Sequence, residues 1–431
     1  MREDMGMKTK TTFLFAALAL AGVAQAFTVS DVTAHQRWPW NGHVDVDFNI
    51  GEATAGETFK IELKATYAGG DRTLEARTYV SEPMAKAGAN RVTWDFGADN
   101  PGFKAEDLRV AVTATPFTNG MDGVWMVIDL SGGKDATKYP VRYTTIAPVH
   151  SVNANDVCKT TELWLKRIKG GSYMFCHGYA SSGYFRVNLK KDFYMGVFEC
   201  TQQQWAQVTG AWPSAFSNTT WRATRPVEKL SLSGVFGHYT WPENQEPSSG
   251  SFIRKMRDRT GLATFNLPTE AQWEWANRCG EVGGFNPCYS RPQIRYGLSE
   301  SGVDFNCTPA ESGTVCVGTY VPNLWGLYET FGNVWELCLD TGIGEETLQK
   351  YYGTTFCGLT EEECTYDRVE VDDPIGGPLT GTYKPQYQYY HVLRGAGWYN
   401  TEGNLTHFQR RPNPDAISSH AKGVRFVVTC E

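Results

Sequence analysis

Apolar residues alternate with polar ones through much of the first third of the chain. In residues 44–48 and 59–64 every second side chain is apolar, and residues 92–96 and 108–112 repeat this period of two. Successive side chains of a strand point to opposite faces, so this period predicts half-buried strands. We therefore expect an all-β unit over residues 27–146, an immunoglobulin-like sandwich of antiparallel sheets.

Helical signals come later and are short. Thr201–Gln204 and Thr269–Gln272 are capping boxes, in which the Thr hydroxyl and the Gln amide satisfy each other's backbone donors. Residues 251–260 predict a third helix, which Gly261 ends as its cap. These patterns predict three helices of two or three turns.

The rest of the chain carries many Gly, Pro and Asn residues, above all between residues 280 and 390. Few helices and long loops are therefore expected in a second domain over residues 158–431. So much irregular chain in a compact domain needs disulfide bridges or metal ions to hold it.

Composition narrows the class of protein. The 431 residues are 41% hydrophobic and 20% charged, which is typical of globular chains, and the net charge is −7. Lys and Arg form no basic stripe, so nucleic acid is not an expected partner.

The first residues have the pattern of a secretory signal. Lys8 and Lys10 precede an apolar run, Phe13–Val23, and Ala24–Ala26 supplies small residues for cleavage. Residues 1–26 are thus expected to be a signal peptide, and the protein to be secreted, periplasmic or at the cell surface. No transmembrane anchor is expected, because no later segment reaches the roughly 20 apolar residues that a span needs.

Eleven cysteines in an exported chain suggest disulfides. Three pairs are close enough in sequence for local bridges: Cys279/Cys288, Cys307/Cys316 and Cys357/Cys364. Sequence does not decide the pairing, and buried free thiols are the alternative.

Four strings in the second domain occur together: LPTEAQWEWA (Leu267–Ala276), NLWGLYETFGNVWE (Asn323–Glu336), LRGAGW (Leu393–Trp398) and GVRF (Gly423–Phe426). Together they resemble the formylglycine-generating enzyme family, also called the sulfatase-modifying factor family. The resemblance implies an α+β domain with a C-type-lectin-like fold, rich in loops.

The resemblance also implies a structural calcium site. Carried over by position, Glu329 and Glu336 would supply carboxylates and Gly332 and Val334 would supply carbonyl oxygens, the ligands that calcium prefers. The alternative is that Glu336 caps a turn or forms an ion pair.

The family's oxidases bind copper(I) through two cysteines and use dioxygen to convert a sulfatase cysteine to formylglycine. In this chain the matching positions are Asn400 and Leu405. An amide and an alkyl group do not replace two thiolates, so copper is not an expected cofactor.

Two alternatives to a loss of this chemistry stay open. One is an oxidase that uses displaced cysteines. The other is a histidine-metal oxidase, as in a related branch of the family that binds iron, and here His407 and His420 lie near Glu402 and Asp415.

Binding is the remaining function. Aromatic, Asn, His and Arg side chains gather towards the C-terminus and are typical of recognition surfaces. The candidate ligand-binding residues are Tyr399, Asn400, Asn404, His407, Phe408, Arg410 and His420. A protein, a peptide or a carbohydrate is the expected partner, and the alternative is that several of these rings belong to the core. Arg394 and Arg425 are expected to stabilise the fold through ion pairs.

Overall fold

The computed structural model describes residues 27–37, 41–53, 57–103, 108–116, 124–152, 154–176, 184–237, 246–280, 313–320, 322–341, 370–374, 390–400, 410–414 and 418–430. The chain forms two compact units. The first takes the described residues of Met1–Thr118 with Arg142–Ile146, and the second takes those of Asn119–Val141 with Ala147–Glu431.

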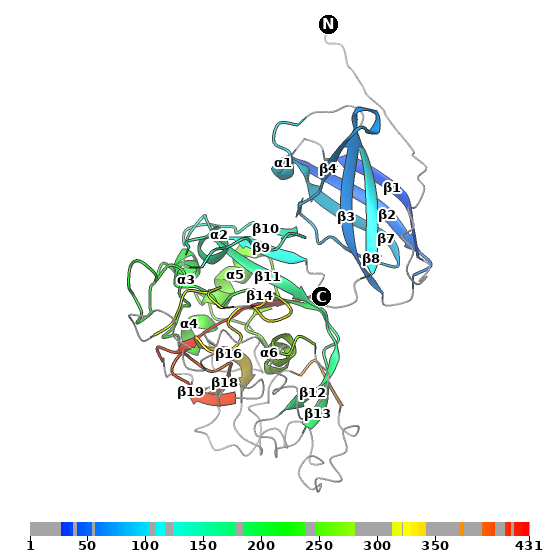
Figure 1. Cartoon of the computed structure of the whole chain (residues 1–431). Coiled ribbons are helices and arrows are strands. Elements are labelled where there is room, and N and C mark those ends of the chain that lie inside the picture. Colours follow the sequence, from blue (N-terminus) through cyan, green and yellow to red (C-terminus); the bar gives the residue numbers. More distant parts are fainter. Residues whose placement is uncertain are drawn as a thin grey trace. The chain divides into compact units, whose positions relative to one another are not determined.

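The first unit is built from antiparallel strands, drawn in blue and cyan in Figure 1. One sheet has the order β1-β2-β7-β5-β10. Its strands are β1 (Thr28–Gln36), β2 (His43–Gly51), β5 (Thr78–Tyr79), β7 (Gly88–Asp95) and β10 (Val141–Thr144).

The unit's second sheet centres on β3 (Thr58–Tyr67). β8 (Arg109–Pro116) pairs with β3 from Phe59 to Thr66. β4 (Arg72–Glu75) and β6 (Met84–Lys86) pair near the two ends of β3. The short η1 (Ala68–Gly70) and α1 (Phe96–Asp99) connect strands.

Alternation produces the core of this first unit. Val46, Phe59, Ile61, Val92 and Trp94 are fully buried in one cluster. The predicted β-rich region at the N-terminal side is confirmed.

The boundary between the units differs from the expected one. β9 (Trp125–Asp129) pairs with β11 (Glu162–Ile168) from Glu162↔Asp129 to Lys166↔Trp125. Residues 124–141 therefore belong to the second unit, whereas β10 returns to the first through Tyr143↔Tyr79. A strand pattern shows which face is buried but not which sheet the strand joins.

Three sheets form the second unit. The largest has the order β9-β11-β14-β21-β15, with β14 (Phe193–Gly196), β15 (Phe265–Asn266) and β21 (Val427–Thr429). A second has β12 (Ser172–Cys176), β13 (Tyr184–Asn188) and β17 (Glu370–Asp372). A third has the order β19-β18-β16-β20, formed by Arg410–Pro414, Tyr390–Arg394, Trp335–Thr341 and Lys422–Gly423.

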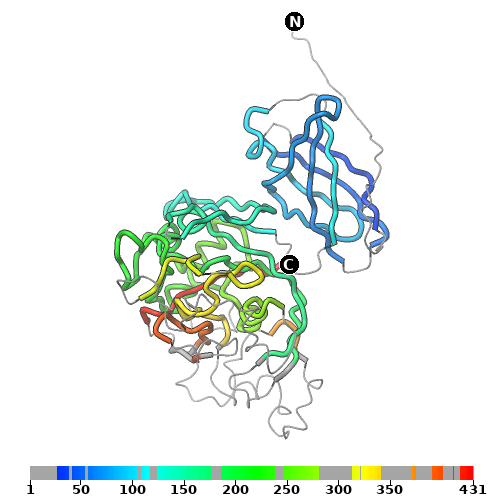
Figure 2. Tube along the Cα trace, viewed as in Figure 1, coloured from blue at the N-terminus to red at the C-terminus, as the bar shows by residue number. Residues whose placement is uncertain are grey.

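The unit's helices are short, as Figure 2 also shows in green. They are α2 (Val157–Thr160), α3 (Gln202–Thr209), α4 (Leu232–Val235), α5 (Phe252–Thr260) and α6 (Glu270–Asn277). Both predicted capping boxes are confirmed at α3 and α6, and Gly261 ends α5 in the left-handed conformation with φ 77°.

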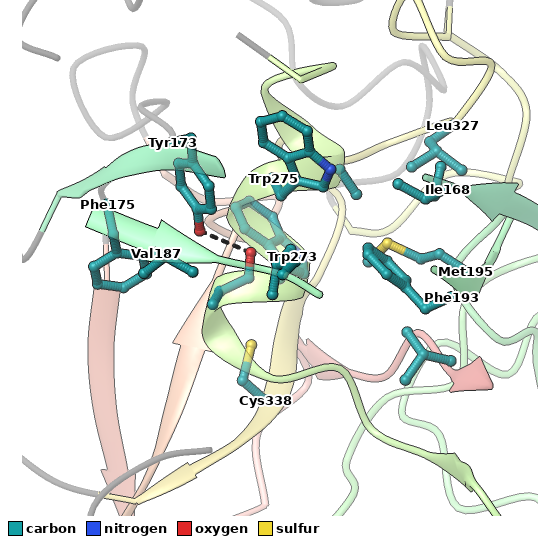
Figure 3. Packing of buried hydrophobic residues seen from close by; sticks show 14 of the residues in the cluster. Ile168, Tyr173, Phe175, Val187, Phe193, Met195, Trp273, Trp275, Leu327 and Cys338 are labelled. Atoms are coloured by element: carbon teal, nitrogen blue, oxygen red, sulfur yellow. Dashed lines mark hydrogen bonds between the residues drawn. The ribbon is translucent and has the colours of Figure 1, made fainter. Parts of the chain in front are cut away.

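Helix α6 places Trp273 and Trp275 among the buried hydrophobic residues of the second unit (Figure 3). Trp273 and Trp275 pack with Tyr173, Phe193 and other rings in one buried cluster. The Tyr173 hydroxyl donates a hydrogen bond to the Ala271 carbonyl at 2.8 Å, which ties β12 to the helix. This packing brings together residues of two of the four sequence strings, Leu267–Ala276 and Asn323–Glu336.

The cysteines differ from the expected bridges. Cys316 is a free thiol, so the expected pair Cys307/Cys316 does not form. Cys288, the expected partner of Cys279, lies outside the described residues. Cys316 is 1% exposed and packs as a small apolar side chain, which is the alternative that sequence left open. Cys357 and Cys364 lie outside the described residues.

Within the described ranges, each helix is too short or too polar to span a bilayer.

Candidate functional site

Arg394 joins two of the family strings. It ends β18 and forms ion pairs with Glu270 at 2.8 Å and Glu274 at 2.7 Å, both on α6. Glu274 also pairs with Arg278 one turn later at 3.1 Å. All four side chains are buried, so the cluster balances its own charge inside the core. The predicted role of Arg394 as an ion-pair partner is confirmed.

Arg425 joins the other strings. Its guanidinium contacts both carboxylate oxygens of Glu336 at 2.7 to 3.0 Å, and the Trp273 indole donates to Glu336 Oε2 at 2.7 Å. Arg425 also donates to the carbonyls of Gly196 and Tyr328. The predicted ion pair of Arg425 is confirmed, and Glu336 is its partner.

Two further buried carboxylates hold the loops beside this pair. Glu329 accepts from the backbone N–H groups of Gly318 at 2.9 Å and Tyr320 at 3.1 Å. Glu199 accepts from Asn333 Nδ2 at 2.6 Å and from the Val334 N–H at 3.1 Å. Burial raises the pKa of Glu329 to about 7 and raises the pKa of Glu199 well above its ordinary value.

These contacts bear on the predicted calcium ligands. Each carboxylate oxygen of Glu329 and Glu336 already accepts a hydrogen bond from the protein, and Arg425 supplies a positive charge beside Glu336. On these contacts the carboxylates of Glu329 and Glu336 do not fit calcium coordination. The carbonyl oxygens of Gly332 and Val334 stay predicted ligands.

Asn400, which the resemblance predicts at the position of a family cysteine, closes a turn. Its Oδ1 accepts from the Gly397 N–H at 2.9 Å, and its own N–H donates to the Gly397 carbonyl at 2.9 Å. Its amide oxygen is thus used inside the turn that presents Trp398 and Tyr399. Leu405 lies outside the described residues.

Three of the described thiols have raised pKa values, which makes them less reactive than an ordinary cysteine. Burial raises the pKa of Cys158 to about 11 and raises the pKa values of Cys200 and Cys338 further above the ordinary one. Since the thiolate is the nucleophile and the metal ligand, these three cysteines are suited to packing.

Four rings from three separate segments meet at the surface. We call Phe216, Trp398, Tyr399 and His420 the aromatic cluster. The centroid of Trp398 lies 5.6 Å from that of Phe216, 5.6 Å from Tyr399 and 5.4 Å from His420. Tyr399 is 44% exposed, and Arg411 Nη1 donates to its hydroxyl at 3.0 Å. The structure thus brings together two predicted ligand-binding residues, Tyr399 and His420.

The other predicted ligand-binding residues are placed differently. Asn400 serves the turn described above, and Arg410 begins β19, but its side chain lies outside the described part of the structure. Asn404, His407 and Phe408 lie outside the described residues. Phe216 was missed, because it comes from the loop between α3 and α4 and carries no signal that links it to Trp398. Arg411 belongs to the C-terminal stretch of recognition-type residues but was not chosen as a candidate ligand-binding residue.

The model of the sulfatase-modifying factor enzyme 1-like domain matches residues 154–430. The chain belongs to this family. The match includes α6, the Arg394 and Arg425 ion pairs and the described members of the aromatic cluster, so all of them belong to the family domain.

Curated relatives match parts of the chain. A serine/threonine-protein kinase pkn1 of Chlamydia caviae is 32% identical over 165 residues, which are 37% of this chain and 21% of the kinase. A formylglycine-generating enzyme of Thermomonospora curvata is 30% identical over 148 residues, 32% of this chain and 41% of that enzyme. The chain thus spans about a fifth and about two fifths of these relatives.

Solved structures were also matched, at low TM-scores. Treponema denticola variable protein 1 has a TM-score of 0.41 at 22% identity, covering 65% of this chain and 99% of that one. PvdO from Pseudomonas aeruginosa has a TM-score of 0.43 at 14% identity, with the same coverage of 65% and 99%.

Proposed function

We propose that this member of the sulfatase-modifying factor family is an exported ligand-binding or scaffold protein without the family's copper-cysteine oxidase chemistry. The observation that carries the proposal is the turn Gly397–Asn400. The residue that replaces a family cysteine closes this turn by hydrogen bonding, and the same turn presents the ring of Tyr399.

Three contacts support binding at this place. The aromatic cluster offers rigid rings, and the exposed Arg411 is held against Tyr399. Beneath the surface, Trp398 is fixed by its backbone N–H, which donates to the Asn333 carbonyl at 2.8 Å. Rigid aromatic area costs little conformational entropy on binding, which is why recognition surfaces use it.

The direct experiment is a binding screen of the purified mature protein against arrayed oligosaccharides and peptides. We expect at least one ligand whose binding is lost in Tyr399→Ala and in His420→Ala, while Lys138→Gln, an exposed cation outside the cluster, binds as the wild type does. If every ligand found binds both cluster variants unchanged, the proposed site is wrong.

Metal analysis separates binding from oxidase chemistry. We expect neither copper nor iron in the purified protein, because the positions of the family cysteines are Asn400 and Leu405. Copper or iron at about one ion per chain would support the oxidase alternatives instead.

A further inference from the structure

The surface around the aromatic cluster carries positive charge. Arg411 is exposed next to Tyr399, and Lys229 is exposed where its backbone N–H donates to the Ser419 carbonyl at 2.9 Å, next to His420. The described segments 211–222, 397–400, 410–414 and 418–421 contain no Asp or Glu. In a chain with a net charge of −7, these described segments differ in sign from the whole sequence.

The acid next in sequence does not cancel this charge at the surface. Glu228 precedes Lys229, but its side chain is fully buried and accepts a hydrogen bond from the Phe216 N–H at 3.0 Å. Burial raises the pKa of Glu228, which disfavours its charged form. Glu228 interacts electrostatically with Lys229, but Glu228 is buried, whereas the side chains of Lys229 and Arg411 are exposed to solvent.

The polar groups of the Trp398 and Tyr399 rings form hydrogen bonds within the protein. Trp398 Nε1 donates to the His420 carbonyl at 3.2 Å, and the Tyr399 hydroxyl accepts from Arg411 at 3.0 Å. The faces of the rings are then the apolar surface that remains for a ligand. Aromatic faces are electron-rich and pack against the polarised C–H groups on one face of a sugar ring.

A peptide strand is a poor fit at the same place. The strand at the edge of the nearest sheet is β19, and two of its five residues, Pro412 and Pro414, have no backbone N–H to donate. Addition of an extended peptide depends on a ladder of such donors. The edge therefore favours recognition by side chains.

We propose that the ligand of this surface is a carboxylate-bearing saccharide. This inference rests on the proposed function of the surface. Sugar rings stack on the faces of Tyr399 and His420, and the sugar carboxylates pair with Arg411 and Lys229. A guanidinium binds carboxylates through paired, charge-assisted hydrogen bonds, so Arg411 selects for the charge while the rings select for the sugar.

The test measures affinity for three probes by isothermal titration calorimetry: oligogalacturonate, the same oligosaccharide methyl-esterified, and polyglutamate of similar charge. We expect oligogalacturonate to bind at least about tenfold more tightly than either of the others, since one charge-assisted hydrogen bond accounts for that factor. Its affinity should also fall as salt is raised.

Variants assign the binding to the cluster. Tyr399→Ala and Arg411→Gln should each lower the affinity for oligogalacturonate about tenfold or more, and Lys138→Gln should leave it unchanged. Circular dichroism and thermal unfolding confirm that each variant is folded.

Each contrary outcome has a meaning. Equal affinity for the methyl ester rules out recognition of the carboxylate, and tighter binding of polyglutamate replaces the saccharide with an acidic peptide. No binding of oligogalacturonate also overturns the inference. The proposed function survives these results if the screen finds another ligand that Tyr399→Ala abolishes, and it fails if that variant changes no binding.

Discussion

Glu336 accepts hydrogen bonds from Arg425 and Trp273 while its side chain is only 1% exposed to solvent. Its charge is thus matched inside the protein by a guanidinium that also binds the carbonyls of neighbouring loops. At the residue scale, charged side chains of the four family strings form ion pairs with one another inside the protein. The same holds for Arg394 with Glu270 and Glu274.

Arg425→Met should destabilise the protein by about 3–5 kcal/mol, because it leaves Glu336 buried without its cation. The measurement is the free energy of unfolding in urea. Arg254→Ala is the matched control, since it removes an exposed pair with Asp258 and should cost at most about 1 kcal/mol. Equal losses of unfolding free energy in the two variants would show that the buried pair contributes no more to stability than the exposed pair.

The pKa of Glu329 predicts a dependence on pH. Burial raises this pKa from 4.5 to about 7 in the folded protein. Between these values the folded chain keeps a proton that the unfolded chain has released, so stability falls as pH rises. Relative to Glu329→Gln, the wild type should lose roughly 3 kcal/mol between pH 4.5 and 7. Parallel unfolding profiles of the two proteins against pH would refute this.

At the scale of elements, α6 connects the sheets of the second unit. The indole of Trp275 on α6 packs against Gly171, the residue before β12, where an added Cβ would overlap the indole. The indole also donates to the Lys169 carbonyl at 2.9 Å. The glycine therefore sets how closely the strand approaches the helix.

Gly171→Ala should lower the free energy of unfolding by about 1–3 kcal/mol, because the methyl group overlaps the Trp275 ring. Gly234→Ala in α4 is the control. An added Cβ there meets no atom closer than 3.9 Å, so alanine should stabilise the protein by up to about 1 kcal/mol. A neutral Gly171→Ala would mean that the strand and the helix separate easily.

Local elements were predictable from sequence, and distant contacts were not. Both capping boxes formed because their partners are three residues apart. Arg425 and Glu336 are 89 residues apart, and Glu199 holds a turn 134 residues away through Asn333. Asn400 was assigned to ligand binding because sequence does not show that its side chain folds back onto Gly397. Contacts between distant segments depend on the fold, which the family resemblance supplied only in outline.

For the whole molecule, two units in one chain fit a β-rich unit followed by the family domain. Export through residues 1–26 stays a prediction, as these residues lie outside the described ones. The charge pairs of the family domain are internal, so its stability should not depend on an added cation.

Calcium tests this independence. After dialysis against a chelator, added calcium should leave the unfolding temperature unchanged, because the oxygens of Glu329 and Glu336 are used by protein donors. A reversible rise of the unfolding temperature by more than about 2 °C on adding calcium would show that this chain binds calcium.

Whether the family fold serves binding instead of oxidation is tested most directly by dioxygen consumption. The mature protein is loaded with copper(I) and mixed with a reductant and a cysteine-containing sulfatase-motif peptide, beside a formylglycine-generating enzyme as the positive control. With Asn400 and Leu405 at the two cysteine positions, we expect no consumption above background and an unmodified peptide in the mass spectrum. Formation of formylglycine by this chain would contradict the proposed function.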